Sequence, residues 1–193
     1  MTALFEAHQS RSSSKTIATD VLLVAGGSLL MAAATHVTVP FDPVPLTLQT
    51  LVAIGLGFAL GPKRGGAAIL AYIVQGLAGW PVFAGTPMQG AGIAYLLGPT
   101  GGFIIGFLVQ AVVAGLLAQR GWGRSMLTAM GAGLLSTASI YPTGLLWLGS
   151  VIGFDKTLLA LGLYPFVLGD LVKALLAGSL LYVSWSVMRG KRK

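Results

Sequence analysis

Two ionisable residues, Asp170 and Lys173, lie three positions apart in an otherwise apolar stretch of the chain. They are the only charged side chains between Leu158 and Met188. On a helix this spacing puts both side chains on one face, with Cβ atoms about 5–6 Å apart. Such a pair can bind a polar ligand, or it can neutralise itself and hold helices together. We favour a ligand site, because buried charges are costly to desolvate and ionisable groups in apolar segments tend to be functional.

The composition places this pair in a membrane. Hydrophobic residues make up 55% of the 193 residues and charged residues only 9%, whereas about 25% of the residues of soluble domains are charged. The length allows about six spans of about 20 residues, with no room for a separate soluble domain. We therefore predict an all-α integral membrane protein that forms one bundle of six transmembrane helices.

The apolar segments divide the chain into a tail, a membrane domain and a basic end. Residues 1–16 are polar and are predicted to be a disordered cytoplasmic tail, residues 17–188 a single six-helix membrane domain, and residues 189–193 a basic cytoplasmic C-terminus. The glycine-rich stretch "LTLQTLVAIGLGFALG" favours close helix packing through small residues. The expected helices lie near residues 19–38, 46–61, 66–83, 101–118, 126–150 and 165–188.

The distribution of basic residues predicts the orientation in the membrane. Lysine and arginine gather in the two termini and in the second and fourth connections, while the other three connections hold only Lys156. This asymmetry is the positive-inside pattern, so both termini are expected to face the cytoplasm. The net charge of +7 is then a topology signal rather than a nucleic-acid patch. The basic residues on the cytoplasmic side are Arg11, Lys15, Lys63, Arg64, Arg120, Arg124, Arg189, Lys191, Arg192 and Lys193.

This orientation puts the connections 39–45, 84–100 and 151–164 at the outer face. The connection 84–100 is uncharged and rich in glycine, and it contains apolar residues such as Ile93 and Tyr95. Non-helical backbone at membrane depth is tolerated only where it is buried in protein or lines a cavity. The segment is therefore either a lid over a pocket or a tight loop that needs glycine for its turns.

Several polar residues can join the charged pair. Pro165 is suited to the first helical turn, so the last helix should begin near it, and Asp170 and Lys173 then lie about 8–12 Å inside its outer end. Thr47 and Gln49 lie near the outer entrance of the second segment and are well placed beside them. Other polar residues within the segments are Gln75, Gln110, Tyr141 and Thr143, each of which alone more often makes an interhelical hydrogen bond.

The sequence argues against enzymatic and metal chemistry. It has no cysteine and only His8 and His36, so no multi-histidine or cysteine metal centre is expected. No stretch matches the phosphate-binding pattern GxxxxGK[ST] or the nucleophile elbow G-x-S-x-G. A proton-coupled secondary transporter stays open, because an intramembrane aspartate can relay protons.

Five ordered motifs together resemble the BioY family, the biotin-specific substrate-binding (S) components of energy-coupling factor (ECF) vitamin importers. The motifs are "DPVPLTLQTL" (42–51), "LGPKRGGAAILAYIVQGLAGWPVFAG" (60–85), "LLGPTGGFIIGF" (96–107), "YPTGLLWL" (141–148) and "PFVLGDLVKALLAG" (165–178). The resemblance implies six transmembrane helices in a bacterial or archaeal cell (inner) membrane, with a biotin site near the outer face. It also implies partnership with an ECF transmembrane coupling protein and cytoplasmic ATPases, besides membrane lipid. An S component for another vitamin is the nearest alternative.

The resemblance puts the family's charged pair at Asp170 and Lys173. The ureido ring of biotin has two N–H donors beside a carbonyl acceptor, and its carboxylate ends a flexible chain. Our hypothesis is that Asp170 accepts a ureido N–H and Lys173 donates to the opposite polar edge, whereas charge alone would favour Lys173 at the carboxylate. If the ring is at the pair, the carboxylate needs donors elsewhere. The candidate binding residues are Thr47, Gln49, Thr86, Gln89, Tyr95, Thr100, Gly101, Tyr141, Asp170 and Lys173; biotin is the transported ligand, and no cofactor is expected.

Overall fold

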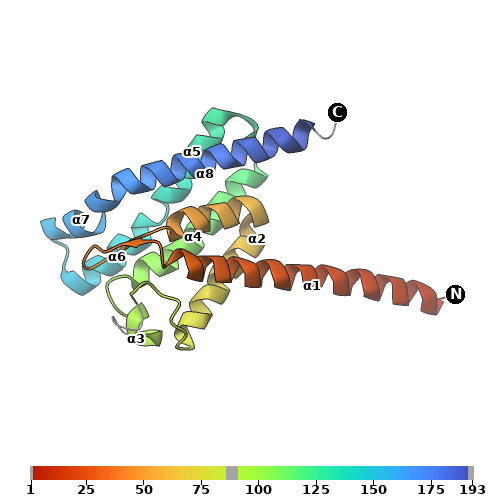
Figure 1. The fold of residues 1–193 in the computed structure, drawn as a ribbon, viewed down its shortest axis with the longest axis horizontal. Coiled ribbons are helices and arrows are strands. Elements are labelled where there is room, and N and C mark those ends of the chain that lie inside the picture. Colours follow the sequence, from red (N-terminus) through yellow and green to blue (C-terminus); the bar gives the residue numbers. More distant parts are fainter. Residues whose placement is uncertain (1, 86–90, 191–193) are drawn as a thin grey trace.

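The computed structural model is a stack of long helices with both chain ends on the same side (Figure 1). It describes residues 2–85 and 91–190, with side chains from 17 to 85 and from 91 to 189. Four helical stretches are long and apolar enough to cross a membrane. These stretches are Ile17–Ala34, Gly101–Gln119, Met126–Ile152 and Lys156–Arg189. The described part of the chain is therefore predominantly helical and suited to a multi-pass membrane protein.

The N-terminal helix α1 spans Thr2–Ala34. Its helical backbone includes residues 2–16, which the sequence analysis assigned to a disordered tail, and it ends four residues before the expected residue 38. The strands β1 (Thr38–Val39) and β2 (Leu46–Thr47) follow and pair as an antiparallel hairpin. The second predicted helix accordingly begins at Gln49 rather than at residue 46, because residues 46 and 47 hydrogen-bond in the hairpin.

Helix α2 (Gln49–Leu77) contains most of the second and third predicted helices as two arms joined by a sharp kink, and it ends six residues before the expected residue 83. At the kink, Gly61 has φ 76° and ψ 176°, a conformation that glycine adopts without steric cost. Pro62 then begins the second arm, where the N–H that it lacks would have had no helical partner. The predicted connection is therefore only the kink at Gly61, and Lys63 and Arg64 lie in the helical second arm.

The remaining helices lie in the order expected from the sequence, with two differences. The predicted helix 126–150 is broken at residues 139–140, because Pro142 has no N–H to donate to the backbone of the preceding turn. Short helices also occupy the loops predicted over 84–100 and 151–164. The elements are α3 (Gly92–Leu96), α4 (Gly101–Gln119), η1 (Trp122–Arg124), α5 (Met126–Ala138), α6 (Tyr141–Ile152), α7 (Lys156–Gly162) and α8 (Tyr164–Gly190).

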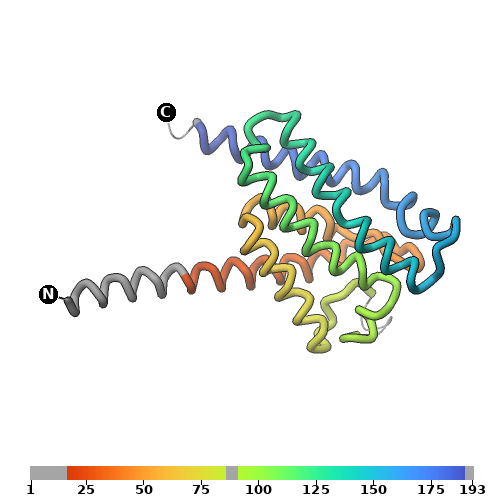
Figure 2. Tube along the Cα trace, turned by 180° about the vertical axis from the view of Figure 1, so that it is seen from behind, coloured from red at the N-terminus to blue at the C-terminus, as the bar shows by residue number. Residues whose placement is uncertain are grey.

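Helix α4 lies between α2 on one side and α5 and α6 on the other, as Figure 2 shows from behind. Glycines allow the close approach. A Cβ atom at Gly57 would lie 2.2 Å from the carbonyl oxygen of Ala111, and one at Gly115 would lie 2.3 Å from the nitrogen of Pro62. Between α5 and α8, a Cβ at Gly133 would lie 2.1 Å from the carbonyl oxygen of Ala174. The predicted packing through small residues is confirmed at these positions.

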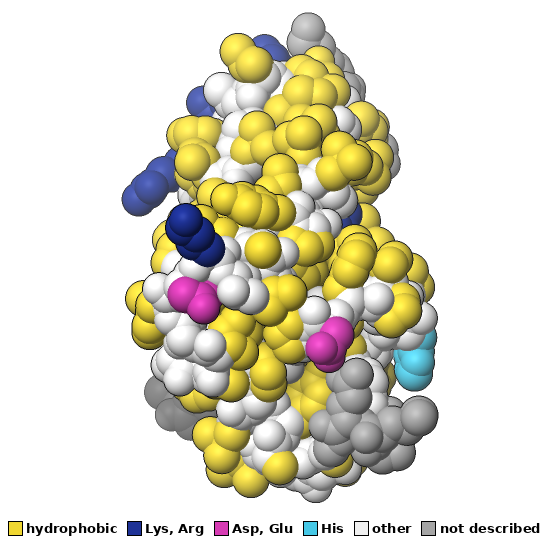
Figure 3. Space-filling model, turned by 90° about the vertical axis from the view of Figure 1, so that its left-hand side faces the viewer, with side chains coloured by type: hydrophobic (Ala, Val, Ile, Leu, Met, Phe, Trp, Pro, Cys, Tyr) yellow, Lys and Arg dark blue, Asp and Glu magenta, His cyan; other side chains and the backbone are white. Residues whose placement is uncertain are grey.

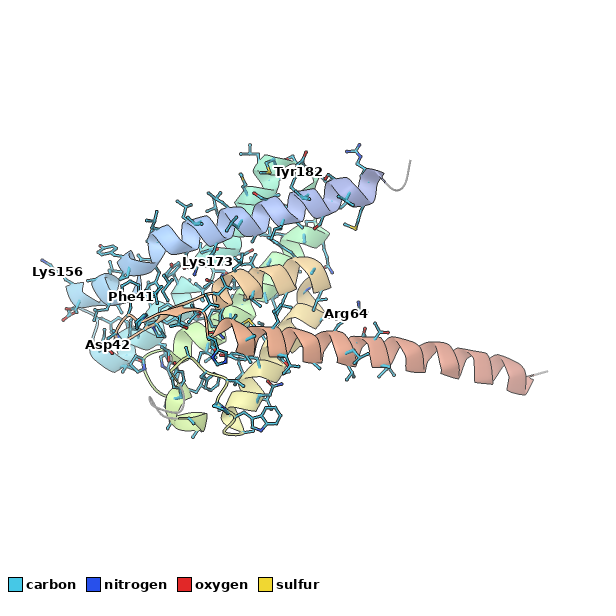
Figure 4. All side chains as sticks on the ribbon, viewed as in Figure 1. Phe41, Asp42, Arg64, Lys156, Lys173 and Tyr182 are labelled. Atoms are coloured by element: carbon cyan, nitrogen blue, oxygen red, sulfur yellow. The ribbon has the colours of Figure 1, made fainter. Side chains whose placement is uncertain are left out.

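The two ends of the bundle differ in charge. Apolar side chains cover much of the end that carries the hairpin and α7 (Figure 3). Asp42 and Lys156 lie at this end, while Arg64 lies toward the other (Figure 4). Arg64 is bound there by Asp20 of α1 at 2.6 Å. The charged pair of α8 lies between these ends, inside the bundle.

Candidate ligand-binding site

Asp170 and Lys173 form a buried ion pair. The Lys173 Nζ lies 2.6 Å from Asp170 Oδ1, and the exposed fractions of the two side chains are 11% and 6%. Lys173 lies between α8 and the first arm of α2 (Figure 4). The prediction that the pair shares an inward face of the last helix is confirmed, and α8 begins at Tyr164, as its Pro165 indicated.

One residue of strand β2 and one residue of helix α2 also accept hydrogen bonds from the Lys173 ammonium. Lys173 Nζ donates to the carbonyl oxygen of Thr47 at 3.1 Å and to the hydroxyl oxygen of Thr50. The Thr50 hydroxyl in turn donates to Asp170 Oδ1 at 3.3 Å. An ammonium has three donors, and here Asp170, Thr47 and Thr50 engage all of them.

The second carboxylate oxygen is bound from α6. Tyr141 donates its hydroxyl to Asp170 Oδ2 at 2.6 Å. This is the one hydrogen bond to Oδ2 among the described residues, so the oxygen keeps acceptor capacity. Three helices thus converge on one carboxylate: α8 carries it, α2 contributes Thr50 and α6 contributes Tyr141.

A cavity beside the ion pair is lined by polar groups and by aromatic rings. Phe103 and Phe107 come from successive turns of α4, and Phe166 lies one turn before Asp170 on α8. Phe41 of the hairpin loop packs edge-on against Phe166, with ring centroids 6.2 Å apart. The cavity has a volume of about 40 Å³, and its lining combines an apolar wall with a few fixed polar groups, which is the chemistry of small-molecule sites. The lining also includes Val44, Pro45, Leu46, Thr47, Thr50, Ile140, Tyr141, Asp170 and Lys173.

A second cavity adjoins the first and shares part of its lining. Its polar members include Gln49, Tyr72 and Thr100, and Tyr95 and Ala84 belong to the segment over it. Gln49 donates to the Tyr72 hydroxyl at 2.8 Å and to the carbonyl oxygen of Met31 at 3.3 Å. The residues common to both cavities are Val44, Pro45, Thr47, Phe103 and Phe107. Together the two cavities run from the ion pair toward the glycine-rich segment.

The described parts of the segment 84–100 are fixed over this second cavity. Tyr95 donates its hydroxyl to the carbonyl oxygen of Ala84, and burial raises the pKa of Tyr95, which therefore stays a donor. Its ring stacks on Phe83, with centroids 5.2 Å apart. Trp147 of α6 donates to the carbonyl oxygen of Gly98 at 2.9 Å. The segment is thus packed into the bundle and lines a cavity.

The structure brings most of the predicted site residues together. Thr47, Tyr141, Asp170 and Lys173 line the first cavity, and Thr47, Gln49, Tyr95 and Thr100 line the second. Gly101 lines neither, because it packs against the backbone, and a Cβ there would lie 1.8 Å from the carbonyl oxygen of Leu96. Thr86 and Gln89 lie outside the described residues.

The two glutamines expected to bridge helices differ. Gln75 donates to the Ser28 hydroxyl of α1 at 3.0 Å, which confirms an interhelical bond. Gln110 is fully buried, yet its amide has no hydrogen-bond partner among the described residues.

Sequence reasoning missed Thr50 and the three phenylalanines of the cavity. Phe166 could have been found, because it lies four residues before Asp170 and therefore on the same helix face. Thr50 lies three residues after Thr47 but pairs with residues 120 and 123 positions away. No local pattern gives such a contact.

Comparisons with known proteins agree with this architecture. The family model described as "BioY family" matches residues 6–190. A probable biotin transporter BioY from Pyrococcus horikoshii is 43% identical over 157 residues, which cover 81% of this chain and 90% of that protein. The biotin transporter BioY of Thermotoga maritima is 33% identical over 148 residues, covering 77% of this chain and 85% of the relative.

A solved structure has a similar fold. The crystal structure of the S-component for biotin from an ECF-type ABC transporter superposes with a TM-score of 0.75 over 89% of this chain and 93% of that chain, at 24% identity. The family match spans almost the whole chain and includes both the hairpin that contacts Lys173 and the helix that carries it. This chain therefore belongs to the BioY family.

Proposed function

We propose that this protein is the biotin-binding S component of an ECF-type importer. It captures biotin at the outer face of a bacterial or archaeal cell membrane and delivers it inward with a transmembrane coupling protein and cytoplasmic ATPases. Its role is that of a transport subunit rather than an enzyme. The names of the relatives and of the structural match support biotin as the ligand.

The observation that carries this proposal is the buried ion pair at the end of an aromatic cavity. Aromatic and aliphatic walls suit the apolar rings and chain of biotin, while the ion pair, Thr50 and Tyr141 supply polar contacts. A site of this kind satisfies the polar edge of a ligand in a surrounding that excludes water.

The hydrogen bonds around the pair favour the ureido ring at Asp170. All three donors of Lys173 are engaged, whereas among the described residues Tyr141 alone donates to Asp170 Oδ2. A ligand N–H can bond to Oδ2 without breaking an existing contact. A ligand carboxylate at Lys173 would have to displace an acceptor and would place a second negative charge beside Asp170.

We also propose six spans with both termini in the cytoplasm. The two arms of α2 supply two spans in addition to the four long apolar stretches. This arrangement gathers Lys63, Arg64, Arg120, Arg124 and Arg189 at one end and leaves Lys156 at the other. The distribution follows the positive-inside rule.

Equilibrium binding to the detergent-purified protein tests the ligand. We expect biotin to bind in preference to thiamine and riboflavin and without ATP. Lys173→Ala and Asp170→Asn should each weaken binding about tenfold or more, because each removes a charged hydrogen-bonding group. Selective binding of another vitamin would identify a different S component, and no binding to a folded sample would refute the proposal.

Transport in proteoliposomes separates the remaining alternative. If the chain is an S component, uptake requires the coupling module and ATP, and a pH gradient alone has no effect. Uptake by this chain alone that follows an imposed pH gradient would favour a proton-coupled transporter instead.

A further inference from the structure

A large groove lies away from the biotin site, at the end of the bundle where the arginines gather. It has a volume of about 660 Å³ and opens between α2, α4 and α8. On α2 it is lined by Leu51, Gly55 and Phe58, and on α8 by residues from Ala177 to Met188. Ala177 and Met188 are eleven residues apart, which corresponds to about 16 Å along the helix axis at 1.5 Å per residue. The groove is thus long and open at the surface of the bundle.

The polar groups of this groove are confined to one end. Its polar side chains are Gln119 and Ser184, and the remainder of the lining is apolar apart from the indole N–H of Trp185. The rest of its length offers no polar side chain to bond a peptide backbone. An occupant with one polar end and a long apolar tail fits this distribution.

Three arginines lie next to residues of the polar end. Arg120 follows Gln119, Arg189 follows Met188, and Arg124 lies over the ring of Trp185 with its Cζ 5.6 Å from the ring centroid. All three are exposed. Among the side chains that the structure describes, the ion pairs are Arg64–Asp20 and Lys173–Asp170. None of the three arginines is therefore neutralised by a carboxylate among these described side chains.

We propose that this groove binds one anionic phospholipid, with an acyl chain along α8 and the phosphate beside Arg120, Arg124 and Arg189. The apolar lining takes the chain, and the unpaired guanidinium groups select a negative headgroup over a zwitterionic one. The proposal uses the orientation given under Proposed function, which puts this end in the anionic cytoplasmic leaflet, but it does not depend on biotin binding.

Lipid binding to the delipidated, detergent-purified protein tests this directly by native mass spectrometry. The probes are palmitoyl-oleoyl phosphatidylglycerol and palmitoyl-oleoyl phosphatidylcholine, which share their chains and differ in charge. We expect the parent to prefer phosphatidylglycerol. Arg124→Gln should lower this preference about fivefold, because a basic residue near an anionic headgroup contributes about 1 kcal/mol.

A matched pair of glycine variants tests the groove itself. A Cβ at Gly55, in the groove, and one at Gly26, on the exposed face of α1, would each meet nothing within 4 Å. Gly55→Leu should therefore fill the groove without a clash and abolish lipid retention, while Gly26→Leu should leave it unchanged. A monodisperse elution peak and an unfolding midpoint equal to those of the parent verify that each variant is folded.

Three results would overturn the proposal. Equal binding of the two lipids would show that the arginines do not select an anionic headgroup. Lipid retention by Gly55→Leu would show that the lipid binds outside this groove. If Gly55→Leu keeps its lipid but no longer copurifies with the coupling protein, the groove is a protein-docking surface.

Discussion

The ion pair of α8 is satisfied by groups from three other parts of the chain before any ligand arrives. The ammonium contacts Asp170, Thr47 and Thr50, and the carboxylate also accepts from Tyr141. Burying two charges is costly, and only close geometry with further hydrogen bonds offsets that cost. The pair therefore couples the site to the packing of α2, α6 and α8, so that ligand contacts and fold stability depend on the same residues.

Removing one member of the pair should cost more stability than removing both charges. Lys173→Met leaves the Asp170 carboxylate buried without its cation, and this should lower the free energy of unfolding by up to about 3–5 kcal/mol. The double variant Asp170→Asn/Lys173→Met leaves no buried charge and should regain most of that loss. Thermal unfolding in detergent, without biotin, measures the stability of the single and the double variant relative to the parent.

An exposed ion pair elsewhere in the chain is the control for these variants. Arg64 and Asp20 also form an ion pair, but their side chains are 44% and 41% exposed. Exposed pairs contribute about 0–1 kcal/mol, so Arg64→Met should have a small effect. A double variant at 170 and 173 as unstable as Lys173→Met would show that buried charge is not the cause.

At the scale of the elements, the predicted site depended on helices that long apolar stretches of the sequence indicate. The start of α8 and the common face of Asp170 and Lys173 follow from Pro165 and from the three-residue spacing. The hairpin, α3 and α7 could not be predicted, because these short elements owe their stability to tertiary contacts rather than to local propensity. Thr47 consequently enters the site through its backbone carbonyl, which no side-chain pattern indicates.

The break between α5 and α6 illustrates the same limit. Hydropathy alone favours one continuous helix over 126–150, yet the backbone breaks just before Pro142. The break lies immediately before Tyr141, whose hydroxyl binds Asp170. Pro142 interrupts the predicted span and lies in the first turn of the helix that carries Tyr141.

The contact between α2 and α4 leads to a prediction about glycine. A Cβ at Gly57 would lie 2.2 Å from the Ala111 carbonyl oxygen, so Gly57→Ala must push the two helices apart. Overpacking of this kind costs about 1–3 kcal/mol, and thermal unfolding in detergent should show a lower midpoint. Because Phe107 lies one turn before Ala111 on α4, biotin affinity should fall as well.

The control is Gly55→Ala, two residues away on the same helix. Its Cβ would meet nothing within 4 Å, and alanine has a higher helix propensity than glycine. The unfolding midpoint should therefore stay the same or rise. Similar losses in both variants would mean that intrinsic flexibility of α2, rather than its contact with α4, is what glycine provides.

For the whole molecule, two functions are separated along the bundle. The biotin cavity lies toward the end with the hairpin and α7, and the lipid groove lies toward the end with the arginines. Helix α8 lines both, with Phe166 to Lys173 at the cavity and Ala177 to Met188 at the groove. This arrangement has a functional meaning only if the two ends face opposite sides of the membrane, as the basic residues predict.

Cysteine labelling in intact cells tests that orientation, and the chain has no cysteine of its own to remove. Lys156 and Arg120 are both exposed and lie in connections assigned to opposite sides. A membrane-impermeant maleimide should label Lys156→Cys in intact cells and Arg120→Cys only after permeabilisation, because positively charged loops stay in the cytoplasm. Labelling of both in intact cells, or of Arg120→Cys alone, would contradict six spans with cytoplasmic termini. It would also move the biotin cavity away from the outer face, so this one assignment decides whether the cavity can capture the vitamin from outside.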